Sequence, residues 1–407
     1  MTSRKIPSAL VSLTFRDFRL LWLGQMSTSM GLWMDNLARG WLMYDLTGSP
    51  FLLGLTGAVK AAPMLGLGLF AGVLADKYKR KPLIIISQIA NALANILLAI
   101  LVVTHTVQPW HILATGFVVG IFQTFQQPAR QAIVSDLVEE KYLANAIALN
   151  SVAFNASRTL GPALAGLLIA VFGVGGSYFF QAAIYIVATI WTVQMVVPEK
   201  SSEDNQKGSV TESLMEGLRY LKKDKLILAL MAMALIPAVL EQPYITLMPI
   251  FAKDIMKVGP QGLGILMGAV GFGSIGGALL SATIYHERHK GPLLLGNAII
   301  FALFLGFFAF TPWFIIALPL LFITGVAQTG YHVLNNTLIQ TLSPRHLRGR
   351  ILGIYFLNRG IAPLGTLLAG SMAHFMGAPY TIGIMAALGV ILPVWIAISV
   401  PRIRKLQ

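Results

Sequence analysis

The sequence Gly72-Val-Leu-Ala-Asp-Lys-Tyr-Lys-Arg-Lys81 closes a long apolar stretch with a cluster of charges. Gly72 has no side chain to hold a neighbouring membrane helix away. Asp76 can pair with a cation or accept hydrogen bonds from the N-terminus of a facing helix. The basic residues that follow, among them Arg80, favour the anionic surface of a membrane. The stretch therefore predicts the cytoplasmic end of a transmembrane helix, where the charges either latch two parts of the protein together or only anchor a loop.

The composition of the whole chain is that of a membrane protein. Of its 407 residues, 56% are hydrophobic and 11% are charged, with a mean hydropathy of +0.72, whereas soluble globular proteins have about 25% charged residues. This excludes an ordinary soluble enzyme, and the lack of cysteine excludes disulfides and cysteine nucleophiles. A membrane-spanning helix needs about 20 apolar residues, and stretches of that length predict an all-α membrane protein with twelve transmembrane helices. These stretches lie at approximately 20–44, 51–75, 82–104, 109–134, 143–172, 176–197, 226–251, 261–285, 292–310, 314–341, 350–375 and 380–400.

The positions of the basic residues predict the orientation in the membrane. If both termini are cytoplasmic, 24 of the 30 Lys and Arg residues fall in cytoplasmic segments, and only Lys253 and Lys257 fall in outer loops. Lys and Arg concentrate in the cytoplasmic loops of membrane proteins. We therefore expect a multi-pass protein of the inner (plasma) membrane with both termini inside. The net charge of +14 is then an orientation signal that meets membrane lipid, so no nucleic-acid partner is expected.

The chain divides into two similar halves. Residues 198–225 are polar and predict a cytoplasmic linker between an N-terminal six-helix half, 1–197, and a C-terminal six-helix half, 226–407. The sequence Gly-Ile-Phe-Gln-Thr at 120–124 recurs as Gly-Val-Ala-Gln-Thr at 325–329, a shift of 205. An even number of helices per copy gives both halves the same orientation, which predicts a parallel repeat.

Motifs along nearly the whole chain carry a resemblance to a known family. The stretch at 72–81, with Lys79 in place of a second loop glycine, resembles the Gly-x-Leu-Ala-Asp-Arg-x-Gly-Arg-Lys loop of the major facilitator superfamily. The full set of motifs is similar to the drug/proton antiporter-like branch that contains the enterobactin exporter and macrolide efflux proteins. The resemblance implies the major facilitator fold, export of an organic compound, and a central cavity lined by the first and seventh helices. The other matching segments are 18–25, 40–42, 46–50, 127–129, 144–146, 161–162 and 348–350.

Gly161 and Pro162 resemble the Gly-Pro element of the superfamily's proton-coupled antiporters. Proline frees a backbone carbonyl and glycine admits a facing helix, so the pair predicts either a pivot or a static packing kink. The residues expected to control conformational change are Gly72, Asp76, Arg80, Lys81, Arg130, Gly161 and Pro162.

Charged residues inside the predicted spans are the strongest functional signal. An ionised group there costs at least about 2.5–3.5 kcal/mol unless it is paired or hydrated. Asp35 and Glu241 each precede an amide and are 206 positions apart, close to the repeat interval. The resemblance places both in the cavity, where a carboxyl group that has lost water binds a proton more readily. We expect them to couple transport to protons, Asp35 above all because Arg39 can exchange partners with it, or else each acid simply neutralises a fixed cation.

The cations within the spans bear on the substrate. Arg158 and Arg359 are permanently charged and suit a substrate carboxylate, phenolate or phosphate, or else salt bridges between helices. With Arg39 and Lys60 they outnumber the two acids, which favours an anionic or zwitterionic substrate over a cationic one. Further polar residues are expected either to line the cavity or to hydrogen-bond between helices. They are Gln123, Gln126, Asn155, Gln328, His332, Asn335 and Asn336.

The sequence contains no nucleotide-binding loop, nucleophile motif or metal-ligand motif. We therefore expect no cofactor, no metal and no catalytic residue. The expected function is that of a monomeric secondary transporter that exports an amphipathic small molecule, in the manner of multidrug efflux proteins, by proton antiport and alternating access. A lipid or lysolipid translocator or an importer on the same fold is the first alternative. A membrane-embedded enzyme or a non-transporting scaffold is the alternative from another class.

Overall fold

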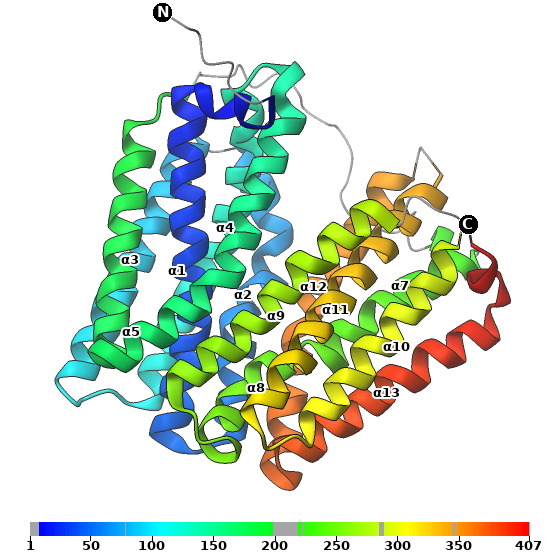
Figure 1. The fold of residues 1–407 in the computed structure, drawn as a ribbon. Helices are drawn as coiled ribbons and strands as arrows, with labels where there is room; N and C mark the ends of the chain where they lie inside the picture. The colour runs from blue at the N-terminus through cyan, green and yellow to red at the C-terminus, as the bar shows by residue number, and fades with distance from the viewer. Residues whose placement is uncertain are drawn as a thin grey trace, which may run out of the picture. The chain divides into compact units, whose positions relative to one another are not determined.

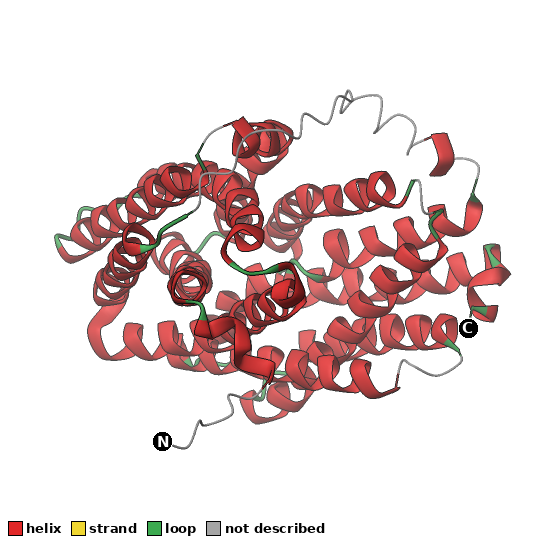
Figure 2. Ribbon diagram, turned by 90° about the horizontal axis from the view of Figure 1, so that it is seen from above, coloured by secondary structure: helices red, strands yellow, loops and turns green. Residues whose placement is uncertain are grey.

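The computed structural model describes residues 8–77, 79–197, 219–221, 224–284, 289–344 and 347–406. In these residues every regular element is a helix (Figures 1 and 2). The α-helices are α1 (Arg16–Thr47), α2 (Pro50–Lys77), α3 (Arg80–Val103), α4 (Pro109–Leu137), α5 (Leu143–Gln194), α7 (Lys225–Ile236), α8 (Tyr244–Ile250), α9 (Gly259–Ile284), α10 (Lys290–Ala309), α11 (Phe314–Leu342), α12 (Arg348–Met376) and α13 (Ala378–Ser399). Short 3-10 turns lie at Ser8–Thr14, Glu140–Tyr142 and Pro401–Lys405, and π-helical turns lie at Pro237–Glu241 and Phe251–Ile255.

Local chemistry explains several helix ends. Pro109 begins α4, and Gln108 and His111 cap that end reciprocally. The Asp224 side chain accepts hydrogen bonds from two backbone N–H groups at the start of α7. Gly173 has a φ of +71°, a conformation that glycine adopts readily. It divides α5 into two helices, at the place where the sequence predicts a break between two spans.

The prediction of an all-α protein with twelve transmembrane helices is confirmed. Among the described residues, nine stretches are long and apolar enough to cross a membrane. One of them, Glu140–Gln194, holds two spans because α5 breaks at Gly173. α1 and α4 complete the set, and they fall outside the nine because charged and glutamine side chains lower their hydropathy. The helix from α7 to the second π-helical turn counts as one span, Lys225–Ile255.

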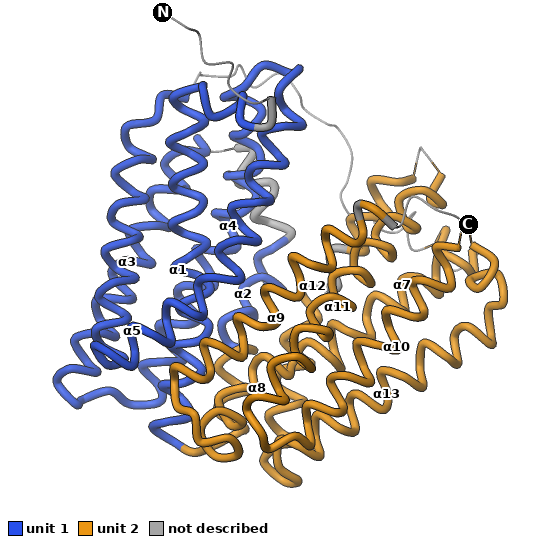
Figure 3. The backbone as a smooth tube through the Cα atoms, viewed as in Figure 1, with its two compact units in different colours: residues 1–47, 59–203 blue, residues 48–58, 204–407 orange. Residues whose placement is uncertain are grey.

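The first of two compact units, called unit 1 here, comprises Met1–Thr47 and Val59–Glu203 (Figure 3). Within it α1 packs along α5, and α3 packs against both α4 and α5. Glycine allows the α1–α5 contact to be close, because a Cβ added at Gly161 would lie 2.8 Å from the Cβ of Trp33. The Gly161-Pro162 element is therefore buried at a tight helix crossing.

Unit 2 comprises Gly48–Ala58 and Asp204–Gln407 (Figure 3). Within it α11 packs against α9 and α10, and α10 packs against α13. The first residues of α2 belong to this unit, whereas the sequence-based halves assign them to the N-terminal half. The reason is a close approach to α12, since a Cβ added at Gly54 would lie 2.8 Å from the Cα of Gly370.

The span that begins with α7 is interrupted. α7 passes into the π-helical turn at 237–241, and a second π-helical turn follows α8. Pro237 and Pro243 lie on either side of Glu241, and proline lacks the N–H that a regular helix needs. π-helical turns of this kind are frequent at functional sites. Glu241 is the last residue of the first turn.

Candidate functional site

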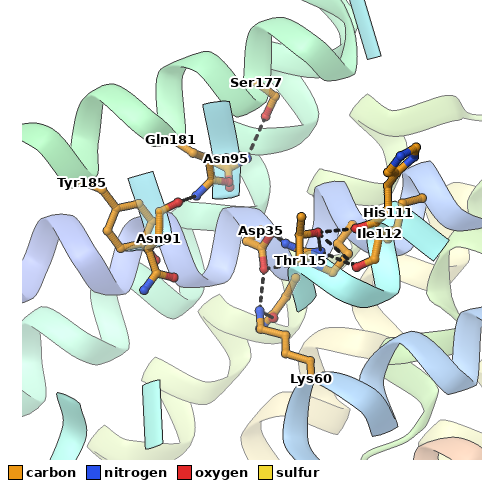
Figure 4. Close-up of polar contacts among 12 residues, drawn as sticks. Asp35, Lys60, Asn91, Asn95, His111, Ile112, Thr115, Ser177, Gln181 and Tyr185 are labelled. Atoms are coloured by element: carbon orange, nitrogen blue, oxygen red, sulfur yellow. Dashed lines mark hydrogen bonds and ion pairs between the residues drawn. The ribbon is translucent and has the colours of Figure 1, made fainter. Parts of the chain in front are cut away.

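A buried ion cluster lies on α1 of unit 1 (Figure 4). Asp35 is 3% exposed and Arg39 is 2% exposed. Arg39 Nη2 lies 2.9 Å from Asp35 Oδ1. Lys60 Nζ reaches the other carboxylate oxygen from α2, at 2.5 Å. Asp35 is thus paired with two cations at once, and these three residues are called the Asp35 cluster.

The other donors of the Asp35 cluster also have partners. Arg39 Nη1 donates to a backbone carbonyl of α4 at 2.7 Å and to Thr115 Oγ1 at 2.9 Å. Lys60 Nζ donates to Asn36 Oδ1 at 2.8 Å. Buried charges are tolerated when opposite charges and hydrogen bonds replace water. The sequence left two interpretations of Asp35 open, and this geometry resembles the one in which the acid neutralises Arg39, with Lys60 added.

α3 carries buried polar residues that were not among the predicted site residues. Asn91 and Asn95 donate to backbone carbonyls one turn earlier on the same helix, at 2.6 and 2.8 Å. Figure 4 shows them beside Gln181 and Ser177 of α5, whose side chains lie 3.4 Å apart. The four-residue spacing of the two asparagines in an apolar segment is the signal that could have identified this face.

A narrow polar pocket lies within unit 1, lined by residues of α1, α4 and α5. It holds about 300 Å³ of empty space, its open mouth included. Two of the expected cavity residues, Gln123 and Gln126, line it together with Arg130. Arg130 Nη1 donates to Gln25 Oε1 at 2.6 Å and to Thr28 Oγ1 at 2.5 Å. The structure thus joins Arg130, expected among the conformational residues, to residues expected to line a cavity.

Glu241 lies in unit 2 and is 2% exposed. Its carboxyl group faces Gly389 of α13, where an added Cβ would overlap it and would lie 3.2 Å from the Cβ of Ala302 on α10. Among the described residues, no cation forms an ion pair with Glu241. The two acids at equivalent sequence positions therefore differ in their described partners, since Asp35 pairs with two cations and Glu241 with none.

One of the polar residues expected on α11 contacts Gln242, the next residue of the interrupted helix. Gln242 Nε2 lies 3.1 Å from His332 Nε2. Asn336 accepts a hydrogen bond from the Gln340 side chain at 3.1 Å. Two further expected residues, Gln328 and Asn335, are buried in the same helix. His332 thus contacts the residue beside Glu241.

Arg158 of α5 is partly buried, and its guanidinium lies over the ring of Trp33, 5.6 Å from the ring centroid. Asn155 is exposed and donates to a backbone carbonyl one turn earlier, at 2.8 Å. Arg359 lies in α12, but its side chain is outside the described residues. The matched depth of the two arginines therefore stays a prediction.

The loop at 72–81 is described in part. The surroundings of Gly72 and the side chain of Asp76 lie outside what the structure describes. Arg80 Nη1 pairs with Asp136 Oδ2 of α4 at 2.6 Å. Lys81 Nζ donates to two backbone carbonyls at the end of α5, at 2.8 and 2.7 Å. These two cations thus tie the start of α3 to its neighbours inside unit 1.

Comparison with known proteins covers almost the whole chain. Residues 7–406 match the family model described as transmembrane secretion effector. The staphyloferrin A transporter of Staphylococcus aureus is 24% identical over 371 residues, which are 88% of this chain and 89% of the relative. The enterobactin exporter of Shigella flexneri is 25% identical over 364 residues, which are 89% of this chain and 86% of the relative.

Solved structures show the same fold at low sequence identity. A crystal structure of a variant of the nucleoside transporter NupG is similar with a TM-score of 0.78 and 12% identity. The match covers 94% of this chain and 99% of that chain. At this identity the likeness concerns the fold alone.

Proposed function

The chain belongs to the transmembrane secretion effector family of the major facilitator superfamily, and from this premise we propose that it exports an anionic amphipathic compound in exchange for protons. Membership makes it a multi-pass membrane transporter and not an enzyme. Rocking of two six-helix halves about a central site is the proposed mode of transport. The inner membrane is the proposed location, with both termini cytoplasmic, because most of the basic residues outside the spans then lie in cytoplasmic segments.

The observation that carries proton coupling is the buried carboxyl group of Glu241. It lies in the membrane-spanning part of unit 2 at the end of a π-helical turn, with no cation paired to it among the described residues. A buried charge without a partner is costly, and binding a proton removes that cost. Glu241 is therefore proposed to bind the exchanged proton. The neighbouring Gln242–His332 contact supplies polar groups beside it.

Asp35 is the weaker of the two candidates for proton exchange. A proton that binds to it must displace both Arg39 and Lys60, which hold its oxygens at 2.9 and 2.5 Å. That displacement would leave two buried cations without an acid. Asp35 is proposed to take part only if substrate or conformational change first withdraws Lys60, whose side chain is 13% exposed.

Positive charge within unit 1 supports an anionic substrate. The Asp35 cluster has two cations and one acid. Arg130 is buried beside neutral partners. A cationic compound would be repelled by both groups, whereas an anion gains from them. Because the relatives are named for staphyloferrin A and enterobactin, these two compounds are the first to test.

The test uses purified protein in liposomes with an acidic lumen. Protons leaving through the protein should drive labelled enterobactin or staphyloferrin A to accumulate above its external concentration. Addition of a protonophore should return it to equilibrium, and liposomes without protein serve as the control. If every transported substrate accumulates to the same level with and without the pH gradient, proton exchange is refuted.

A further inference from the structure

The polar pocket of unit 1 contains an arginine whose N–H donors are only partly hydrogen-bonded in the described part of the chain. Arg130 is 5% exposed, and its hydrogen bonds in the described part of the chain go from Nη1 to the neutral groups of Gln25 and Thr28. Its Nε is buried and has no partner among the described residues. A guanidinium has five N–H donors in a fixed planar fork. The two neutral acceptors both bind Nη1, so no described acidic group balances the positive charge of Arg130 and most of its N–H donors have no described acceptor.

A second donor without a partner lies in the same wall. Gln126 is 8% exposed, and its Nε2 is buried with no hydrogen-bond partner among the described residues. The amide of Gln123 and the hydroxyl of Ser29 also line the pocket. No acidic side chain is among the described lining residues. Buried polar groups are nearly always hydrogen-bonded in folded proteins, so these two donors need acceptors that the described residues do not supply.

We propose that this pocket binds a carboxylate group of the transported compound, with Arg130 and Gln126 as its donors. A carboxylate matches the guanidinium fork with two parallel hydrogen bonds and supplies the missing negative charge. The pocket is narrow and open at its mouth, far smaller than a site that encloses a whole drug-sized compound, so it suits one carboxylate arm of a larger molecule. The substrate class in this proposal rests on the proposed function. The test itself measures binding alone and does not require transport.

The test compares salicylate with salicylamide, its neutral analogue of nearly the same shape. Binding to the protein in lipid nanodiscs is followed by saturation-transfer NMR at neutral pH, in a chloride-free buffer that contains no other carboxylate. The wild type should bind salicylate at least about tenfold more tightly than salicylamide, since charge-assisted hydrogen bonds are about twice as strong as neutral ones. Arg130→Gln should abolish that preference.

Two further variants keep the test independent of folding defects. Gln126→Glu places an acid beside Arg130 and should weaken salicylate binding at least about tenfold, with the arginine still present. Gln131→Glu adds the same charge one residue from Arg130, at an exposed position that does not line the pocket, and should leave binding unchanged.

The outcomes separate this site from the proposed function. Equal binding of the two probes by the wild type, or a preference that survives both Arg130→Gln and Gln126→Glu, would overturn the carboxylate site. Displacement of salicylate by millimolar chloride at constant ionic strength would instead make the pocket a site for inorganic anions and would also overturn it. A wild-type protein that binds salicylate but shows no gradient-driven transport would refute proton exchange and leave the site standing.

Discussion

Asp35 is the acid on which two buried cations depend, so its replacement tests a structural role directly. Asp35→Asn leaves Arg39 and Lys60 without a negative partner, and removal of one member of a buried ion pair costs about 3–5 kcal/mol. We expect a clearly lower thermal unfolding midpoint for the detergent-solubilised protein. The double variant with Lys60→Met should recover part of the loss because one unpaired charge is gone. An Asp35→Asn protein as stable as the wild type would show that the cluster is not structural.

Arg158 offers a fixed charge over an aromatic face, an arrangement that suits an anionic compound. Its guanidinium lies 5.6 Å from the Trp33 ring centroid. Arg158→Gln should raise the substrate concentration needed for half-maximal transport about tenfold, since loss of a charged hydrogen bond costs about 1.5–3 kcal/mol. Arg158→Lys keeps the charge and should have a smaller effect. If both variants fold and transport with normal affinity, Arg158 serves packing and not substrate binding.

At the scale of elements, the crossing of α1 and α5 depends on a missing side chain. A Cβ at Gly161 would lie 2.8 Å from Trp33 Cβ and 3.3 Å from the Met30 carbonyl oxygen. Gly161→Ala should therefore destabilise the protein by about 1–3 kcal/mol, the usual cost of overpacking. Gly296→Ala on α10 is the matched control, because nothing lies within 4 Å of its added Cβ. Equal unfolding midpoints for the two variants would show that the crossing tolerates the methyl group.

The sequence predicts most of these elements because apolar length is a strong local signal. The break between the fifth and sixth spans is confirmed at Gly173, where glycine permits a positive φ. The π-helical turns were not predicted, although Pro237 and Pro243 indicate that the helix opens beside Glu241. Proline indicates where a backbone hydrogen bond of the helix is lost. The form of the interruption depends on how the helix packs against its neighbours.

For the whole molecule, the sequence predicts the fold and the family, but it does not predict which side chains pair with one another. Asp35 and Glu241 look equivalent in the repeat, yet Asp35 pairs with Lys60 of α2 as well as with Arg39 of its own helix. The contact with Lys60 joins α1 to α2 across 25 positions, which a pattern along one helix cannot indicate. Arg130 was expected to act in conformational change, whereas its unpartnered Nε and the pocket that it lines depend on packing among α1, α4 and α5, which the sequence does not show. The role of Asp76 stays a prediction.

Gradient-driven transport by Glu241→Gln tests whether Glu241 carries the exchanged proton. This substitution keeps size and hydrogen bonding but removes the proton site. In liposomes with an acidic lumen we expect the variant to lose accumulation of labelled substrate while it retains exchange between equal substrate pools. Asp254→Asn, an exposed acid on the same interrupted helix, should behave as the wild type. Full accumulation by Glu241→Gln would contradict proton coupling through Glu241.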